Sequence, residues 1–167
     1  EKAAQVLSFT HFDDVYDTLI YSRLIEKALG LAPGVRSIID LGAGSSIPGL
    51  LAISDSDRKD VSLLAVDLDP EARTVGAENA AKLGLSDKFQ FRLGRLEEAL
   101  SDLAPLSPQS MVVSNPPYIA SPEHLQEKFF IPVNGGPEGD DYLLKILNTP
   151  MAAGTHVVLL WGSLTAP

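Results

Sequence analysis

The chain has 167 residues, 45% of them hydrophobic and 21% charged, which suits one globular domain with its own core. It has no cysteine, which excludes disulfide bonds, thiolate metal sites and a cysteine nucleophile. A net charge of −9 argues against an extensive nucleic-acid-binding surface, because such surfaces are usually basic. No apolar run is long enough for a membrane span, no secretory leader is visible, and His11, His124 and His156 lack metal-ligand spacing. We therefore expect a cytoplasmic protein with no membrane association and no metal site.

Short apolar runs alternate with predicted helices along the chain. A helix is expected first, over residues 8–30, because apolar residues recur there at helical spacing. Further apolar runs predict strands at 37–41, 61–66, 89–93, 110–114 and 155–161, the last of them buried. Helices are expected after a glycine turn at 42–44 and over 70–83, 96–103 and 140–147, with an irregular loop over 119–139. Ser45 or Ser46 is expected to cap the helix after the glycine turn, and Asp69 the helix from residue 70.

This alternation predicts a Rossmann-like α/β fold, a doubly wound and mostly parallel sheet covered by helices on both faces. We expect residues 1–34 to form an N-terminal helical segment and residues 35–167 the core. Ligands of such sheets bind beyond the carboxyl ends of the strands, at the topological switch point. The three unusual turns of the chain follow the first, second and fourth strands, so they all lie at that edge and predict a ligand site there.

The first two of these turns suggest a nucleoside. Gly42 and Gly44 would let ligand atoms approach the backbone, although a tight strand–helix turn explains them about as well. The stretch is not a dinucleotide fingerprint, because Ile47 stands where the third glycine belongs. Asp67 ends the second strand, where a carboxylate can accept hydrogen bonds from two ribose hydroxyls. Alone, Asp67 would more often be a solvated acid; together with the glycine turn it favours nucleoside binding.

Three motifs together resemble class I S-adenosylmethionine-dependent methyltransferases. They are Asp-Leu-Gly-Ala-Gly at 40–44, Ala-Val-Asp-Leu-Asp-Pro at 65–70 and Asn-Pro-Pro-Tyr at 115–118. The resemblance covers roughly residues 36–161, and Gly-Gly-Pro-Glu-Gly-Asp-Asp-Tyr at 135–142 makes it strongest to the release-factor glutamine methyltransferases. It implies S-adenosyl-L-methionine as cofactor and methyl transfer to a planar nitrogen, either a glutamine amide or the exocyclic amine of adenine.

The resemblance also implies roles for individual residues. The expected cofactor-binding residues are Asp40, Gly42, Gly44, Asp67, Leu68 and Asn115. The expected catalytic residues are Asn115, Pro116 and Tyr118, and the expected substrate contacts are Pro117, Tyr118, Gly135 and Gly136.

The chemistry of the Asn-Pro-Pro-Tyr motif supports these roles. A planar NH2 group is a poor nucleophile because its lone pair is delocalised. The Asn115 side-chain oxygen and the Pro116 carbonyl can each accept one of its hydrogens, which aims the nitrogen and stabilises developing positive charge. Tyr118 offers an aromatic face to the planar group. A Pro-rich turn without function would explain the prolines but neither Asn115 nor Tyr118.

The chain departs from the family pattern at several points. Ser46 replaces the third glycine of the usual turn, and Arg95 stands where related enzymes carry an acid near the adenine amine. Only about 35 residues precede the first strand, and no final hairpin follows the fifth. We therefore expect a fragment, or a partner chain or missing domain that completes the sheet edge.

Several functions remain open from the sequence. An N-methyltransferase acting on a protein glutamine or similar amide is favoured, and the acidic segment 138–141 makes a protein or peptide substrate more plausible than nucleic acid. The alternatives are an adenine N6-methyltransferase acting on RNA or DNA, which Arg92 and Arg95 would favour, and a non-catalytic cofactor-binding or scaffolding domain.

Overall fold

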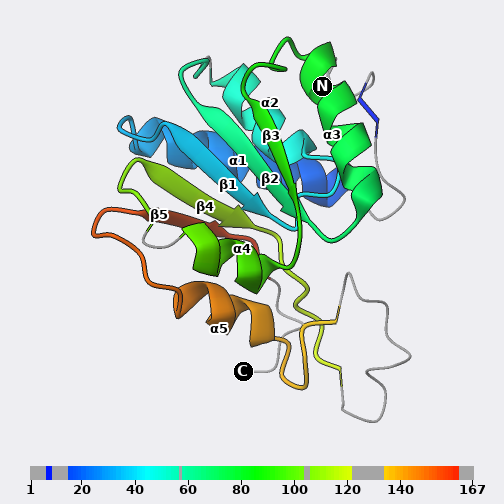
Figure 1. Ribbon diagram of the computed structural model, residues 1–167, viewed down its shortest axis with the longest axis vertical. Coiled ribbons are helices and arrows are strands. Elements are labelled where there is room, and N and C mark those ends of the chain that lie inside the picture. Colours follow the sequence, from blue (N-terminus) through cyan, green and yellow to red (C-terminus); the bar gives the residue numbers. More distant parts are fainter. Residues whose placement is uncertain (1–6, 9–14, 57, 104–105, 122–133, 162–167) are drawn as a thin grey trace.

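A five-stranded parallel sheet forms the centre of the protein in the computed structural model, which describes residues 7–8, 15–56, 58–103, 106–121 and 134–161. The strands, in the order β3-β2-β1-β4-β5 (Figure 1), are β1 (Ser37–Leu41), β2 (Ser62–Asp67), β3 (Phe89–Leu93), β4 (Ser110–Ser114) and β5 (His156–Leu159). The helices are α1 (Val15–Leu31), α2 (Ile47–Asp55), α3 (Pro70–Lys82), α4 (Leu96–Leu103) and α5 (Asp141–Leu147). The order reverses beside β1, so the predicted doubly wound, Rossmann-like sheet is confirmed.

Two apolar layers cover the sheet. Helices α1, α2 and α3 pack on one face, where Ile25, Leu50 and Ala80 meet inward-facing strand residues such as Ile38. Helices α4 and α5 pack on the other face, where Leu100 and Ile146 contribute to a second cluster. β1 and β4 lie between both layers and are buried along nearly their whole length, as parallel strands covered on two faces must be.

The sequence-based boundaries differ from the structure in three places. Ser8 is not helical, so the first helix does not begin at residue 8. Ser46 stands at the N-cap of α2, but its side chain makes no capping hydrogen bond, whereas Asp69 caps α3 by accepting from the Glu71 amide at 2.9 Å. The fifth strand is not fully buried: it lies at the sheet edge, with His156 exposed and the following Trp161 52% exposed. His11 and His124 lie outside the described residues.

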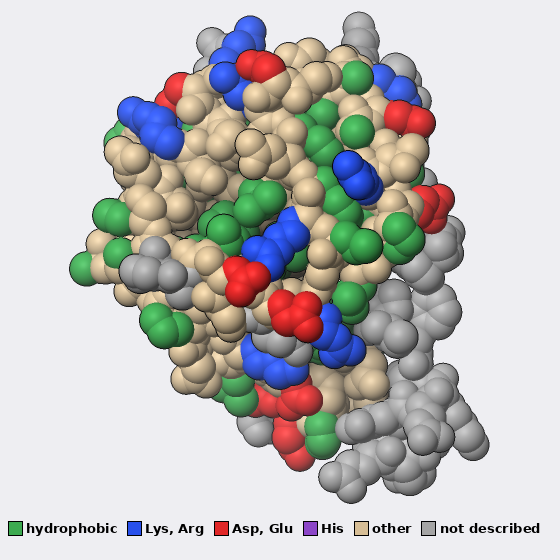
Figure 2. Space-filling view, in the orientation of Figure 1, with side chains coloured by type: hydrophobic (Ala, Val, Ile, Leu, Met, Phe, Trp, Pro, Cys, Tyr) green, Lys and Arg blue, Asp and Glu red, His purple; other side chains and the backbone are tan. Residues whose placement is uncertain are grey.

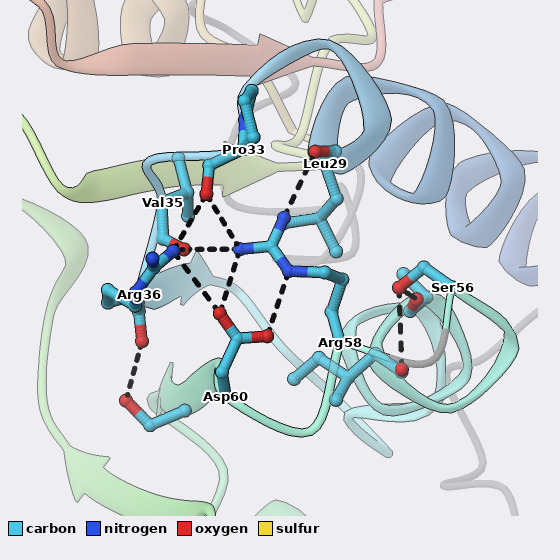
Figure 3. A network of polar contacts seen from close by, with 10 residues as sticks. Leu29, Pro33, Val35, Arg36, Ser56, Arg58 and Asp60 are labelled. Carbon is cyan, nitrogen blue, oxygen red and sulfur yellow. Dashed lines mark hydrogen bonds and ion pairs between the residues drawn. The ribbon is translucent and has the colours of Figure 1, made fainter.

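The amino-terminal ends of β1 and β2 are joined by one arginine (Figure 3). The Arg58 guanidinium donates to the carbonyl oxygens of Leu29 at 3.2 Å and Val35 at 2.6 Å, and to the Asp60 carboxylate at 2.9 Å. Arg58 thus adds a charged donor to carbonyls at the end of α1 and in the connection to β1 and ties the two segments together. This edge is opposite to the predicted ligand site, so the network serves the fold.

Candidate functional site

The glycine turn after β1 is held by backbone bonds to β2. The amides of Gly42 and Ala43 donate to the Val66 carbonyl at 2.8 and 3.1 Å. Gly42 and Gly44 have φ values of 74° and 48°, in the left-handed region that glycine enters without steric cost. The turn therefore needs glycine for its path, whether or not a ligand approaches it.

Asp67, at the end of β2, lies directly against this turn. One carboxylate oxygen accepts from the Gly44 amide at 2.8 Å, and the other accepts from the Asp69 amide at 2.9 Å. The first bond joins the ends of β1 and β2, the second is local, and each carboxylate oxygen keeps a second acceptor position. The side chain is half-buried, so it is fixed in orientation and still reachable. The structure thus brings Gly44 and Asp67 together, as the sequence predicted, and leaves acceptors for two hydroxyl groups.

Ser46 continues the turn in a conformation that suits glycine. Its φ is 60° and ψ 8°, and it is the one described non-glycine residue with positive φ. The residue is fully buried, and its hydroxyl has no hydrogen-bond partner in the described part of the chain. Glycine would adopt this left-handed backbone without the steric cost that a side chain brings. The departure noted in the sequence therefore has a conformational cost.

Asn115 follows β4 beside the glycine turn. Leu41 pairs with Ser114 across β1 and β4, so Gly42 and Asn115 are the next residues on neighbouring strands. The Ser114 hydroxyl donates to the Leu41 carbonyl at 2.7 Å and fixes the two strand ends to each other. The Asn115 Oδ1 atom is buried and accepts no hydrogen bond within the described residues. Because a buried acceptor without a donor costs about 1 to 3 kcal/mol, this oxygen is suited to a donor from outside the chain.

The segment from residue 134 packs on the Asn-Pro-Pro-Tyr motif. The Gly135 amide donates to the Ile119 carbonyl at 2.9 Å, and the Ser121 amide donates to the Gly136 carbonyl at 2.7 Å. A side chain at Gly135 would come within 2.8 Å of the Tyr118 Cα atom, so only glycine allows this approach. Gly136 has a φ of 89° and faces the Asp141 carboxylate. The predicted substrate residues Tyr118, Gly135 and Gly136 are therefore neighbours.

Apolar and charged side chains border the site. Leu68 and Leu93, at the adjacent ends of β2 and β3, are 52% and 58% exposed. Arg92 is paired with Asp102, whereas Arg95 is exposed and no ion pair to it is found among the described residues. On the face shown in Figure 2, basic and acidic side chains lie beside one another, so the described part of this face carries no continuous basic surface.

The remaining predicted site residues lie close to this edge. Pro116 is buried and Pro117 half-buried. Asp40 is only 1% exposed and lies on the sheet face covered by α2, with its Oδ2 atom 3.6 Å from where a Cβ of Gly49 would be. Its assignment as a cofactor contact stays a prediction. Among the described residues, no group of three or more histidine or acidic side chains could hold a metal ion, and no helix is long and apolar enough to cross a membrane.

Two residues of this edge were missed from the sequence. Ser114 links β4 to β1, and Asn79 on α3 donates to the Ser45 carbonyl in the glycine turn at 3.1 Å. Asn79 is fully buried, and its polar side chain on the sheet-facing side of a helix was the signal available.

Similarity to known sequences points to methyltransferases, although no family model matches the chain. The chain is 33% identical over 130 residues to a ribosomal protein uL3 glutamine methyltransferase of Bordetella pertussis, which covers 71% of this chain and 42% of that protein. It is 38% identical over 101 residues to a release factor glutamine methyltransferase of Cereibacter sphaeroides, covering 60% of this chain and 33% of that protein. It is also 33% identical over 92 residues to a tRNA1(Val) (adenine(37)-N6)-methyltransferase of Aeromonas salmonicida, covering 55% and 36%. The chain thus spans less than half the length of these relatives.

Similarity to solved structures concerns the fold. An S-adenosylmethionine-dependent methyltransferase from Agrobacterium tumefaciens has a TM-score of 0.58 and 15% identity, covering 89% of this chain and 45% of that one. An RNA methyltransferase from Salinibacter ruber, in complex with S-adenosyl-L-homocysteine, has a TM-score of 0.52 and 22% identity, covering 84% and 76%. Together with the sheet order, these similarities show that the chain has the Rossmann-like fold of class I methyltransferases.

Proposed function

We propose that this chain is part of an S-adenosylmethionine-dependent N-methyltransferase that methylates a planar amide nitrogen, most directly a glutamine side chain of a protein. The observation that carries the proposal is the buried, unpartnered Oδ1 atom of Asn115 at the carboxyl end of β4. An acceptor held there, beside the glycine turn, needs a donor, and an amide NH2 group supplies one. Two relatives named glutamine methyltransferases, at 33% and 38% identity, support this choice of substrate.

The chain's own residues would orient the amide. Asn115 Oδ1 and the Pro116 carbonyl would accept its two hydrogens, which directs the nitrogen and stabilises the positive charge that grows on it. Tyr118 would hold the planar group, with its backbone supported by the close approach of Gly135. When bound, S-adenosylmethionine would supply an electrophilic methyl group. The proton released from the nitrogen would pass to solvent.

The residues at the edge fit that cofactor. Asp67 is fixed by the Gly44 and Asp69 amides and keeps acceptors for the two ribose hydroxyls. Leu68 and Leu93 offer exposed apolar surface where the adenine ring would lie. Arg95 cannot accept from the adenine amine, so the ring would be held by these apolar contacts.

Adenine is the second candidate substrate. It is supported by the relative named as an adenine N6-methyltransferase and by the exposed Arg95, which could contact a phosphate. The pairing of Arg92 with Asp102 and the interspersed charges in Figure 2 favour a protein substrate instead. A cytoplasmic location remains a prediction from the sequence.

Calorimetric titration with S-adenosylhomocysteine, and with NAD as the control ligand, tests the cofactor. We expect binding of the first alone, weakened at least about tenfold by Asp67→Ala, because the two proposed hydrogen bonds to the ribose hydroxyls are lost. An unchanged affinity in that variant would contradict the placement. Titration with single-stranded RNA and DNA at two salt concentrations, in the presence of S-adenosylhomocysteine, tests the substrate class. Tight nucleic-acid binding that weakens steeply as salt rises would indicate several phosphate contacts, and adenine would then replace the amide as the proposed substrate.

A further inference from the structure

Asn79 makes three hydrogen bonds that join the N-terminal segment, Leu7 and Ser8, to the glycine turn. Its Oδ1 atom accepts from the Ser8 amide at 2.8 Å, and its Nδ2 atom donates to the Ser8 carbonyl at 2.7 Å. The same Nδ2 atom donates to the Ser45 carbonyl at 3.1 Å. Asn79 and Ser45 are both fully buried. One amide side chain therefore contacts both segments, which are 37 positions apart along the chain (45 − 8).

Leu7 anchors the N-terminal segment next to this amide. It is 8% exposed and packs in a small apolar cluster with Ile47 and Leu51 of α2 and with Leu19 of α1. Figure 1 shows the segment beside α3, away from the sheet. Ser8 also receives a bond from Lys82 at the exposed end of α3, at 2.8 Å between Nζ and Oγ. The segment thus lies where α1, α2 and α3 meet.

The glycine turn needs support of this kind. Gly44 and Ser46 both have positive φ, and Ser45 lies between them, so the Ser45 carbonyl belongs to the most constrained part of the turn. Helix α3 approaches the turn at Gly76, where a Cβ atom would come within 2.9 Å of the Ser46 hydroxyl oxygen. Asn79 lies three residues further along, on the same face of α3. A strained backbone persists only where its surroundings hold it in place.

We propose that Asn79 is a positioning residue for the ligand-binding turn, and that docking of Leu7 and Ser8 fixes the orientation of the Asn79 side-chain amide. With Ser8 bound, the Asn79 amide plane is fixed and its Nδ2 atom points at both carbonyls. Without Ser8, the side chain keeps one bond and gains freedom to rotate, so the Ser45 carbonyl is held less often. The N-terminal segment thereby controls the shape of the turn. The consequence for cofactor affinity rests on the function proposed above.

Amide hydrogen exchange in the full chain, without ligand, tests the structural part. The Ser46 amide donates to the Ala43 carbonyl at 2.7 Å and reports on the turn. We expect Asn79→Ala to raise its exchange rate about tenfold, the value of one buried hydrogen bond, and Leu7→Ala to raise it in the same direction. Lys82→Ala is the matched control, because its bond to the Ser8 hydroxyl is exposed and contributes little to docking, and the change leaves the bonds between Asn79 and the Ser8 backbone in place. Unchanged Ser46 exchange in both variants, or an equal rise in the control, would overturn the proposal.

The double variant separates the Asn79 path from direct packing. Leu7 also touches α2, so its loss could loosen the turn without Asn79. If the effect passes through Asn79, adding Leu7→Ala to Asn79→Ala changes Ser46 exchange little further. Fully additive effects would show that Asn79 does not transmit the docking. Should Asn79→Ala fail to fold, Leu7→Ala alone with the Lys82→Ala control still decides whether the segment holds the turn.

S-adenosylhomocysteine tests the consequence for binding. Because coupling is reciprocal, the ligand should slow exchange of the Ser8 amide in the wild-type chain, and Asn79→Ala should abolish that slowing. The Val61 amide, bonded to the Arg58 carbonyl at 2.9 Å on the opposite edge, is the internal reference for general stabilisation. If the ligand binds but slows exchange of the Ser8 amide no more than exchange of the Val61 amide, the coupling is refuted. If no ligand binds while the variants still loosen Ser46, the proposed function fails and the positioning role of Asn79 stands.

Discussion

Replacing Ser46 by glycine should stabilise the fold. Ser46 has a φ of 60°, which costs a residue with a side chain about 1 to 2 kcal/mol. Its hydroxyl is buried and has no partner in the described part of the chain, which adds about 1 to 3 kcal/mol. Glycine removes both costs but makes the unfolded chain more flexible, which offsets about 0.4 to 1 kcal/mol. The net expected gain is about 1 to 4 kcal/mol in the free energy of unfolding.

Urea denaturation of three variants separates these contributions. Ser46→Gly should raise the urea concentration at the unfolding midpoint without changing the dependence of the unfolding free energy on urea. In thermal unfolding of a chain of this size, each kcal/mol corresponds to roughly 2 to 4 °C in melting temperature. Ser46→Ala removes the hydroxyl but keeps the left-handed backbone, so it should gain less. Ser45→Gly is the matched control: its hydroxyl is also buried without a partner in the described residues, but its φ is not positive. If Ser46→Gly is no more stable than Ser46→Ala, the backbone at this position is not strained and the reasoning is refuted.

Three further predictions concern catalysis and pH. Asn115→Ala should leave S-adenosylhomocysteine affinity nearly unchanged but lower turnover of an identified amide substrate about 100-fold or more, since it removes an acceptor that acts in the transition state; normal turnover would make Asn115 a turn residue only. The hydrogen bond from Arg58 lowers the pKa of Asp60, so its contribution to stability is present above the unfolded-state pKa of 3.8 and is lost as pH falls through the lower folded value. Asp60→Asn should therefore reduce the fall of the urea midpoint as pH decreases, and an unchanged dependence of the midpoint on acid pH would contradict this. Burial, and then the charge of Asp40, raise the pKa of Tyr21 well above 10.0, so the folded chain keeps a proton that the unfolded chain releases and stability should fall as pH rises above 10. Tyr21→Phe should reduce that alkaline loss; an identical alkaline profile would count against it.

The sheet and most of its helices could be predicted because apolar periodicity decides them. Strands such as 37–41 and 110–114 are buried on both faces, so apolar side chains point to both sides, and their predicted bounds match the structure. The fifth strand has the same apolar character but lies at the edge of the sheet, and no local pattern distinguishes an edge strand from a central one. Its burial was therefore overestimated.

The candidate site could be predicted where the position of a residue in its motif suggests one structural role for that residue type. Gly44 and Asp67 are the glycine and the acid that such a turn requires, and the structure brings them within hydrogen-bond distance. Ser46 was expected to cap α2 because serine usually does so, but the left-handed backbone leaves its hydroxyl unbound. Asn79 was missed because its partners, Ser8 and Ser45, are distant in sequence, and only the packing of α3 brings them together.

The two edges of the sheet differ in how their polar groups are satisfied, and this contrast supports the proposed ligand site at the carboxyl-terminal edge. At the amino-terminal edge, Arg58 binds Asp60 and the nearby carbonyl oxygens of Leu29 and Val35. At the carboxyl-terminal edge, the described side-chain oxygens of Ser46 and Asn115 are buried without partners, and three consecutive turn positions include two with positive φ. A fold selected for stability alone would remove these costs, as glycine at position 46 would do. Unsatisfied acceptors and backbone strain concentrated at one edge are what a site that binds an external donor requires. The polar groups that make this edge costly in the free chain are the ones that the proposed cofactor and amide substrate would satisfy.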